Sequence, residues 1–257
     1  MTVRLTKRDI DVFKFIFKNS YVTTSQIHRA TFRNNSRSTV KARIYQLALA
    51  GYLEKINGDD NFIQTLFRLK RAALDELLLP KEEILRYERK KLITEQLTHD
   101  LKVIDCRTEL EPAPNITGWI PSQKLREYSH MVYQFKENGR TKVPDAIFDL
   151  KAKGTTLKVA FEFENTAKKK SRYFNIFEKY LTLIPVDLVL YVVRPLYLKD
   201  TLLSIGRQKM AELKEREISV KNKLYVATLE DFEKHGLQTY FEGVDGKKFS
   251  INALSEK

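Results

Sequence analysis

Three carboxylates lie at the ends of two segments that we predict to be strands. Asp145 stands near the start of the segment 142–150, and Glu162 and Glu164 close the segment 156–164. If the two segments form a hairpin, the three acids meet at one of its ends. Asp145 and Glu162 are then placed to share one Mg²⁺ or Mn²⁺ ion, because these cations prefer oxygen ligands. Glu164 lies on the same strand face as Glu162, about 6–7 Å further along.

Four basic residues follow these acids and open a predicted helix over residues 167–183. They are Lys168, Lys169, Lys170 and Arg172. Positive charge at the start of a helix opposes the helix dipole, so a phosphate partner would account for it. A divalent cation beside a phosphate activates water and neutralises charge at phosphorus, as phosphodiester cleavage requires. We therefore expect Lys168 to act with the three acids in catalysis, and the other three basic residues to contact DNA.

The composition favours a polyanionic partner. The chain has 257 residues and a net charge of +13, and excess Lys and Arg bind nucleic acid by displacing counterions from phosphates. The single cysteine, Cys106, excludes an intramolecular disulfide and fits a reducing cytosol. The longest apolar run, residues 181–193, is too short to cross a bilayer. We expect a cytoplasmic protein that binds double-stranded DNA and no membrane.

Residues 1–79 are predicted to form a winged helix-turn-helix DNA-binding domain. A capping box of Thr6 and Asp9 opens the first helix, and Thr23 opens the second. The third helix follows Ser36 and ends before Gly51. An Asn-Gly turn at residues 57–58 then indicates a β-hairpin.

The third helix is the expected recognition helix. Val40, Ile44 and Leu47 form its apolar stripe. The remaining positions face outward and carry small, hydroxyl, aromatic and basic groups suited to base edges and phosphates. The predicted DNA-binding residues of this helix are Arg37, Ser38, Thr39, Lys41 and Tyr45.

Residues 80–257 are predicted to form one α/β domain with a mixed sheet. A long helix over residues 81–107 comes first, followed by short strands and the acidic hairpin. The apolar run 188–193 is typical of a central strand that is covered on both faces. A helix over 199–217 and a strand over 224–228 complete the βαβ crossovers. Tyr173 and Tyr180 fall on the core stripe of the helix 167–183, which favours packing over a nucleophilic role.

Pro144-Asp145 followed by Glu162-Phe163-Glu164 resembles the PD-(D/E)xK nuclease motif. That resemblance implies a restriction-endonuclease-like fold and a divalent metal held by Asp145 and Glu162. The family usually has lysine at the position of Glu164, so a lysine from the next helix, Lys168 or Lys170, would substitute, or activity would be lost. Many members carry a further acid on the preceding helix, and Glu95 is the corresponding candidate here.

Over residues 5 to about 195 the chain resembles a narrower group, the replication-relaxation family with its MobC-type mobilisation relaxases. The similarity rests on the winged helix, His99-Asp100-Leu101, Pro-Asp, Glu164-Asn165-Thr166 and a tyrosine-containing helix. It implies nicking of plasmid or mobile-element DNA in mobilisation or replication, with accessory mobilisation or replication proteins. The sequence is also compatible with a homodimer.

Two other functions remain open. In the first, the chain is a DNA-binding regulator of transcription or replication, and its nuclease-like domain is a non-catalytic platform. Glu164 in place of the usual lysine favours this alternative. Alternatively, the chain is a protein–protein adaptor in a DNA-transfer complex. Simpler structural alternatives also stand: Glu162 and Glu164 on the solvated face of an edge strand, Asp145 as a turn residue, and Glu95 and His99 as a surface pair.

Overall fold

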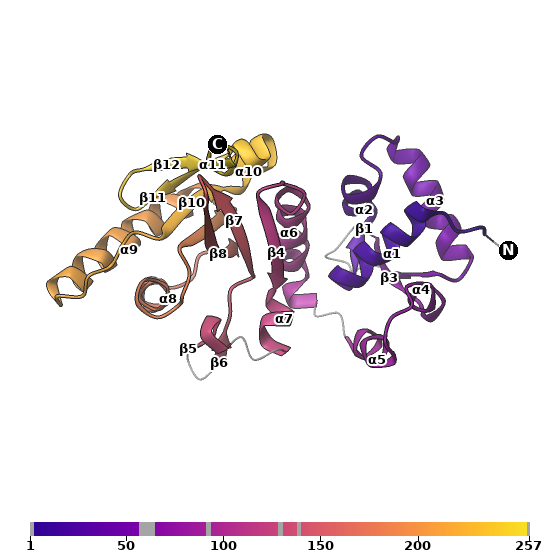
Figure 1. Cartoon of the computed structure of the whole chain (residues 1–257), viewed down its shortest axis with the longest axis horizontal. Coiled ribbons are helices and arrows are strands. Elements are labelled where there is room, and N and C mark those ends of the chain that lie inside the picture. Colours follow the sequence, from indigo (N-terminus) through magenta and orange to yellow (C-terminus); the bar gives the residue numbers. More distant parts are fainter. Residues whose placement is uncertain (1–2, 57–64, 91–93, 128–130, 138–139, 256–257) are drawn as a thin grey trace. The chain divides into compact units, whose positions relative to one another are not determined.

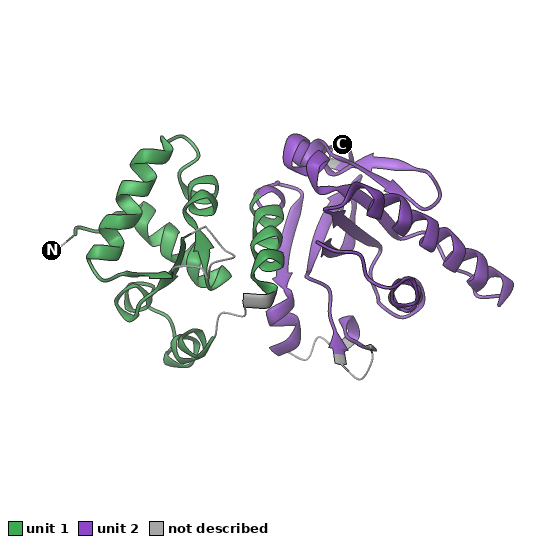
Figure 2. Cartoon of the chain, turned by 180° about the vertical axis from the view of Figure 1, so that it is seen from behind, with its two compact units in different colours: residues 1–108 green, residues 109–257 purple. Residues whose placement is uncertain are grey.

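The structure, a computed structural model, shows a mixed α/β protein (Figure 1). It describes residues 3–56, 65–90, 94–127, 131–137 and 140–255. The chain divides into two compact units, unit 1 (Met1–Thr108) and unit 2 (Glu109–Lys257), which Figure 2 colours separately. The division falls within the helix Thr94–Leu110. It lies later in the chain than the boundary between residues 79 and 80 that the sequence suggested. The reason is that residues 80–108 pack into unit 1: for example, the Tyr87 hydroxyl donates to the Ser20 carbonyl at 2.8 Å.

Unit 1 combines helices with one small antiparallel sheet, whose strand order is β1-β3-β2. Its elements are α1 (Lys7–Asn19), β1 (Val22–Thr23), α2 (Thr24–Thr31), α3 (Arg37–Leu49), β2 (Leu53–Ile56), β3 (Leu66–Leu69), α4 (Arg71–Glu76), α5 (Lys81–Arg89) and most of α6 (Thr94–Leu110). The Asn-Gly turn predicted between the last two strands lies outside the described residues.

The helix starts of unit 1 follow directly from the sequence. Thr6 and Asp9 form the predicted capping box of α1, and Thr23 with Gln26 forms one at α2. Gly51, just beyond the end of α3, has a positive φ of 86°, which suits glycine. The predicted stripe of α3 is confirmed, since Val40, Ile44 and Leu47 are all buried.

The prediction of one long helix over residues 81–107 was wrong. α5 ends at Arg89, and Lys90 has an extended conformation with φ −64° and ψ 124°. A second helix, α6, begins at Thr94. The Lys/Glu-rich segment contains neither proline nor glycine, so nothing in local propensity marks this break.

Unit 2 is built on a seven-stranded mixed sheet with the order β12-β11-β10-β9-β8-β7-β4. Its strands are β4 (Ile116–Pro121), β7 (Ala146–Ala152), β8 (Thr155–Glu164), β9 (Leu188–Val193), β10 (Leu224–Thr228), β11 (Tyr240–Gly243) and β12 (Lys248–Ser250). β8, β9 and β10 run parallel, and the remaining neighbours pair antiparallel. A separate two-stranded sheet holds β5 (Phe135–Glu137) and β6 (Arg140–Lys142).

Two long helices, α8 (Lys170–Thr182) and α9 (Leu196–Glu215), connect the parallel strands and pack on each other beside the sheet (Figure 1). Tyr173 and Tyr180 of α8 share a core with Val189 and Tyr191 of β9, as the sequence predicted for the two tyrosines. The shorter elements are α7 (Ser122–Glu127), the 3-10 turns η1 (Met131–Tyr133) and η2 (Gly236–Gln238), α10 (Leu229–His235) and α11 (Ile251–Ser255).

The order of strands and helices in unit 2 agrees with the predicted α/β class. β9 lies at the centre of the sheet and is almost wholly buried, as its apolar run predicted. α10 contacts β9 and β10, and α11 contacts β7. In the described part of the chain, no helix has the length and apolar character that crossing a bilayer would need.

The acidic hairpin exists, but its first strand starts later than predicted. β7 begins at Ala146, and the chain turns at Val143–Asp145 before it. Lys142 therefore ends β6 instead of opening β7. Pro144 explains the separation, because proline has no N–H for a strand ladder.

Candidate functional site

β7 and β8 bring two of the acids side by side. Ala146 pairs with Phe161 across these antiparallel strands, so the preceding Asp145 lies next to Glu162. The Phe163 backbone N–H donates to Oδ2 of Asp145 at 2.8 Å. Asp145 is thus a turn residue whose carboxylate is fixed to the neighbouring strand.

Glu162 and Glu164 lie at the end of an internal strand. β8 pairs with β7 on one side and β9 on the other, and Glu164 is in register with Val193. The two glutamates are 2% and 5% exposed, so the alternative of a solvated edge-strand face is excluded. Buried carboxylates need partners, and each of these two has a lysine and a tyrosine.

Glu162 is held by Lys142 and Tyr180. Lys142 Nζ lies 2.9 Å from Oε1 and 2.8 Å from Oε2 of Glu162, and the Tyr180 hydroxyl also donates to Oε1. Burial lowers the pKa of Lys142, but the charges of Glu162, Asp145 and Glu164 outweigh this effect and raise it. Lys142 therefore stays an ammonium ion at neutral pH.

The same environment acts on Glu162. Burial raises the pKa of the Glu162 carboxyl, and Asp145 raises it further, while the ion pair with Lys142 opposes both. Burial also raises the pKa of Tyr180, and so does the charge of Glu162. Tyr180 is consequently a neutral hydrogen-bond donor and not a phenolate.

Glu164, like Glu162, contacts one tyrosine and one lysine, and both follow it in the sequence. Tyr173 donates its hydroxyl proton to Glu164 Oε2 at 2.6 Å and accepts from the Lys168 backbone N–H at 3.2 Å. Lys168 Nζ forms an ion pair with Glu164 Oε1. The lysine predicted to act beside the acids is therefore in direct contact with one of them.

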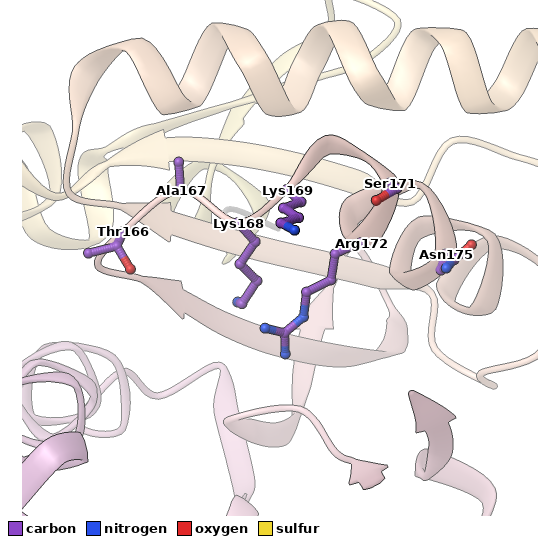
Figure 3. Close-up of a pocket in the computed structure, with 7 residues that line it drawn as sticks. All are labelled: Thr166, Ala167, Lys168, Lys169, Ser171, Arg172 and Asn175. Atoms are coloured by element: carbon purple, nitrogen blue, oxygen red, sulfur yellow. The ribbon is translucent and has the colours of Figure 1, made fainter. Parts of the chain in front are cut away.

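Three of the four predicted basic residues line a pocket at the start of α8. This pocket has a volume of about 580 Å³ and is lined by Thr166, Lys168, Lys169, Ser171, Arg172 and Asn175, among others. Figure 3 shows the side chains of Lys168 and Arg172 extending in the same direction. Lys170 instead holds its ammonium group over the Phe174 ring, 5.6 Å from the centroid. The pocket is open and cationic, and Lys168 links it to Glu164.

The acids fit a divalent cation only in part. Asp145 and Glu162 offer carboxylates from adjacent strands, which suffices for Mg²⁺ or Mn²⁺ with water and phosphate as the remaining ligands. Within the described residues, however, no group of three or more His, Cys, Asp or Glu is arranged to hold a metal. Lys142 takes the place of a cation at Glu162, so an ion would have to replace that ammonium group.

Glu95 belongs to α6 of unit 1, and its side chain lies outside the described part of the structure. His99, its predicted neighbour, places Nδ1 3.4 Å from Asp100 Oδ1.

The predicted recognition helix α3 exposes most of its candidate residues. Arg37, Ser38, Thr39 and Lys41 are exposed, whereas Tyr45 is half-buried and meets the Phe67 ring edge-on at 6.1 Å. α3 is held to α1 by Arg43, whose guanidinium donates to both carboxylate oxygens of Asp9 at 2.9 and 2.6 Å. A rigidly placed helix with an exposed polar and basic first turn suits contact with a duplex.

Sequence reasoning missed Lys142 and the hydroxyl contacts of the two tyrosines. Lys142 stands three residues before Asp145, whereas the motif has its lysine after the second acid. Tyr173 and Tyr180 are seven residues apart on one buried face of α8, and that spacing near two buried acids was the available signal.

No family model, curated protein or solved structure matches this chain.

Proposed function

We propose that the protein is a DNA-binding, Mg²⁺- or Mn²⁺-dependent DNA endonuclease that nicks plasmid or mobile-element DNA in mobilisation or replication. The observation that carries the proposal is the placement of Asp145 and Glu162 side by side on adjacent strands, with Glu164 and a cationic pocket following on the same strand and helix.

The architecture of both units supports this proposal. Three helices and a three-stranded antiparallel sheet in unit 1 fit a winged helix-turn-helix. In unit 2, the order β7-β8-α8-β9 around the acids fits a restriction-endonuclease-like core of the PD-(D/E)xK type. An exposed basic turn on α3 would bind the duplex, and unit 2 would cleave it.

Each residue of the site has a proposed role. Asp145 and Glu162 would hold the divalent cation, which supplies water activation and charge neutralisation when bound. Glu164, fixed by Tyr173, would serve as a further ligand or orient the attacking water. Lys168 and the pocket residues Lys169 and Arg172 would bind the phosphate and stabilise its added negative charge.

A nicking assay tests the proposal. Supercoiled plasmid carrying the origin of the protein's own mobile element is incubated with the full chain and Mn²⁺. We expect conversion to the open-circular form, and loss of at least a hundredfold in rate for Asp145→Asn, because one of two metal-holding carboxylates is removed.

Asp149→Asn is the matched control. Asp149 lies on the same strand, is half-buried and pairs with Lys158, but stands four residues from the acidic site. It should nick at the wild-type rate. Nicking that survives in Asp145→Asn, or DNA binding without cleavage in both Mg²⁺ and Mn²⁺, contradicts the endonuclease proposal.

A second candidate function is a non-catalytic DNA-binding regulator. It is favoured by the two ion pairs Lys142–Glu162 and Lys168–Glu164, which supply a counter-charge to both buried glutamates without a metal. In that case the chain would bind its DNA site with the same affinity in the presence and absence of divalent cations.

A further inference from the structure

The strand that carries Lys142 does not belong to the seven-stranded sheet. β6 pairs with β5 alone among the described strands, in a two-stranded sheet of its own. This small sheet rests on α8, where the Phe135 ring meets Tyr180 edge-on at 6.0 Å. The acids therefore sit on the central sheet, while the ammonium group that neutralises Glu162 comes from a peripheral element.

Lys142 and a divalent cation would require the same atoms. Lys142 Nζ lies within 2.9 Å of both oxygens of Glu162, and these are the oxygens that a hard cation would take. Two cations on one carboxylate repel each other strongly where water is excluded. A metal at Glu162 would therefore compete with Lys142 in its present position.

We propose that Lys142 is an internal competitor of the divalent cation: its ammonium group occupies Glu162 until a metal replaces it, and so sets the metal affinity of the site. The inference rests on the proposed function in taking Asp145 and Glu162 as the metal-holding pair. Lys142 is here a positioning residue, which keeps the buried acids together while no metal is bound.

Calorimetric titration of the full chain with MnCl₂, without DNA, tests this inference. Lys142→Met keeps the length of the side chain and removes its charge. We expect it to bind Mn²⁺ at least tenfold more tightly than the wild type, because the metal no longer has to displace an ammonium group. Lys142→Gln, which keeps a polar end, should change the affinity in the same direction.

Two controls separate competition at Glu162 from a general change in charge. Lys158→Met removes an ammonium group that pairs with Asp149, and Lys136→Met removes an exposed one from β5. Both should change the Mn²⁺ affinity much less than Lys142→Met does. Equal effects of Lys142→Met and Lys158→Met would overturn the inference, because charge alone would then explain the affinity.

Thermal unfolding provides a second readout if the variant is unstable. Without metal, Lys142→Met should melt at a lower temperature than the wild type, because Glu162 loses its counter-ion. Saturating Mn²⁺ should raise the melting temperature of the variant more than that of the wild type. An equal or smaller rise contradicts the inference.

The outcomes distinguish this inference from the proposed function. If the wild type nicks DNA and binds Mn²⁺, and Lys142→Met binds it no more tightly, only the inference fails. If Lys142→Met gains affinity but neither protein nicks DNA, the inference stands and the endonuclease proposal fails. Absence of Mn²⁺ binding in every variant overturns both.

Discussion

Glu162 illustrates how single residues define this site. It is a buried carboxylate that receives hydrogen bonds from Lys142 and Tyr180, and its neighbour Asp145 is fixed by a backbone N–H. Unpartnered, such a charge would cost several kcal/mol. The donors therefore stabilise a set of acids that would otherwise repel one another.

Tyr180→Phe measures one of these donors. The variant keeps the ring and removes the hydroxyl that donates to Glu162, so we expect a loss of about 1.5–3 kcal/mol in the free energy of unfolding, as for hydrogen bonds to charged groups. Fluorescence of Trp119, the only tryptophan and a residue of unit 2, follows urea unfolding.

Tyr240→Phe is the comparison for Tyr180→Phe. Tyr240 is 65% exposed on β11, so the loss of its hydroxyl should alter the free energy of unfolding by less than about 0.5 kcal/mol. Equal stability of the two variants would mean that Tyr180 does not hold the buried carboxylate.

The sequence revealed part of this residue set. Alternation along 156–164 predicted that Glu162 and Glu164 share a face, and Pro144 placed Asp145 at a turn. Lys142 could not be assigned, because its approach depends on a turn at residues 143–145 and on a separate small sheet. Such a long-range arrangement leaves no periodicity in the sequence.

Among the elements, α1 and α3 depend on the ion pair of Asp9 and Arg43. Asp9 also accepts from the backbone of Thr6 at 2.7 Å, so one carboxylate caps α1 and binds α3. Burial raises the pKa of Asp9, but the hydrogen bonds from Arg43 and Thr6 outweigh it, and the pKa is lowered. A lowered pKa stabilises unit 1 above pH of about 4, and this stabilisation is lost as the pH falls through the folded-state pKa.

Arg43→Met tests this pair. We expect a loss of about 3 kcal/mol in unit 1 near pH 6.5, because the Asp9 carboxylate remains buried without its partner. Amide hydrogen exchange should quicken in α1 and α3, while unfolding of unit 2, followed by Trp119, stays unchanged. The difference from the wild type should shrink as the pH falls through the folded-state pKa of Asp9, because protonation of the carboxyl removes the ion pair.

The exposed Lys41→Met on the same helix should leave amide exchange in α1 and α3 as in the wild type. A difference between Arg43→Met and the wild type that grows as the pH falls would contradict the assignment, because an ion pair with a carboxylate of lowered pKa weakens in acid.

Element types were easier to predict than their ends. α1, α2 and α3 have capping residues in the sequence, and β9 is marked by an uninterrupted apolar run. The break between α5 and α6 carries no such mark, because Lys90 has an extended backbone without proline or glycine nearby. Local propensity therefore does not account for the end of α5.

For the whole molecule, the net charge of +13 predicts DNA binding that weakens with salt. Lys41→Ala removes one expected phosphate contact from α3. We expect weaker binding to all duplexes and a slope of log affinity against log salt that is smaller by about 1. Fluorescence anisotropy with a labelled duplex at several NaCl concentrations gives both quantities.

Lys214→Ala removes the same charge from the exposed surface of α9 in unit 2 and should leave the slope unchanged. Wild-type affinity that is flat against salt would contradict the DNA-binding account and favour the adaptor function, since phosphate contacts release counterions.

The central claim is that Asp145 and Glu162 together hold a divalent cation. Crystals of the full chain grown with excess Mn²⁺, measured for anomalous scattering, test it most directly. We expect an anomalous peak between these two carboxylates, with Lys142 Nζ displaced from Glu162, and loss of the peak in Asp145→Asn. Absence of a peak at this position, with Lys142 still bound to both oxygens of Glu162, would contradict it.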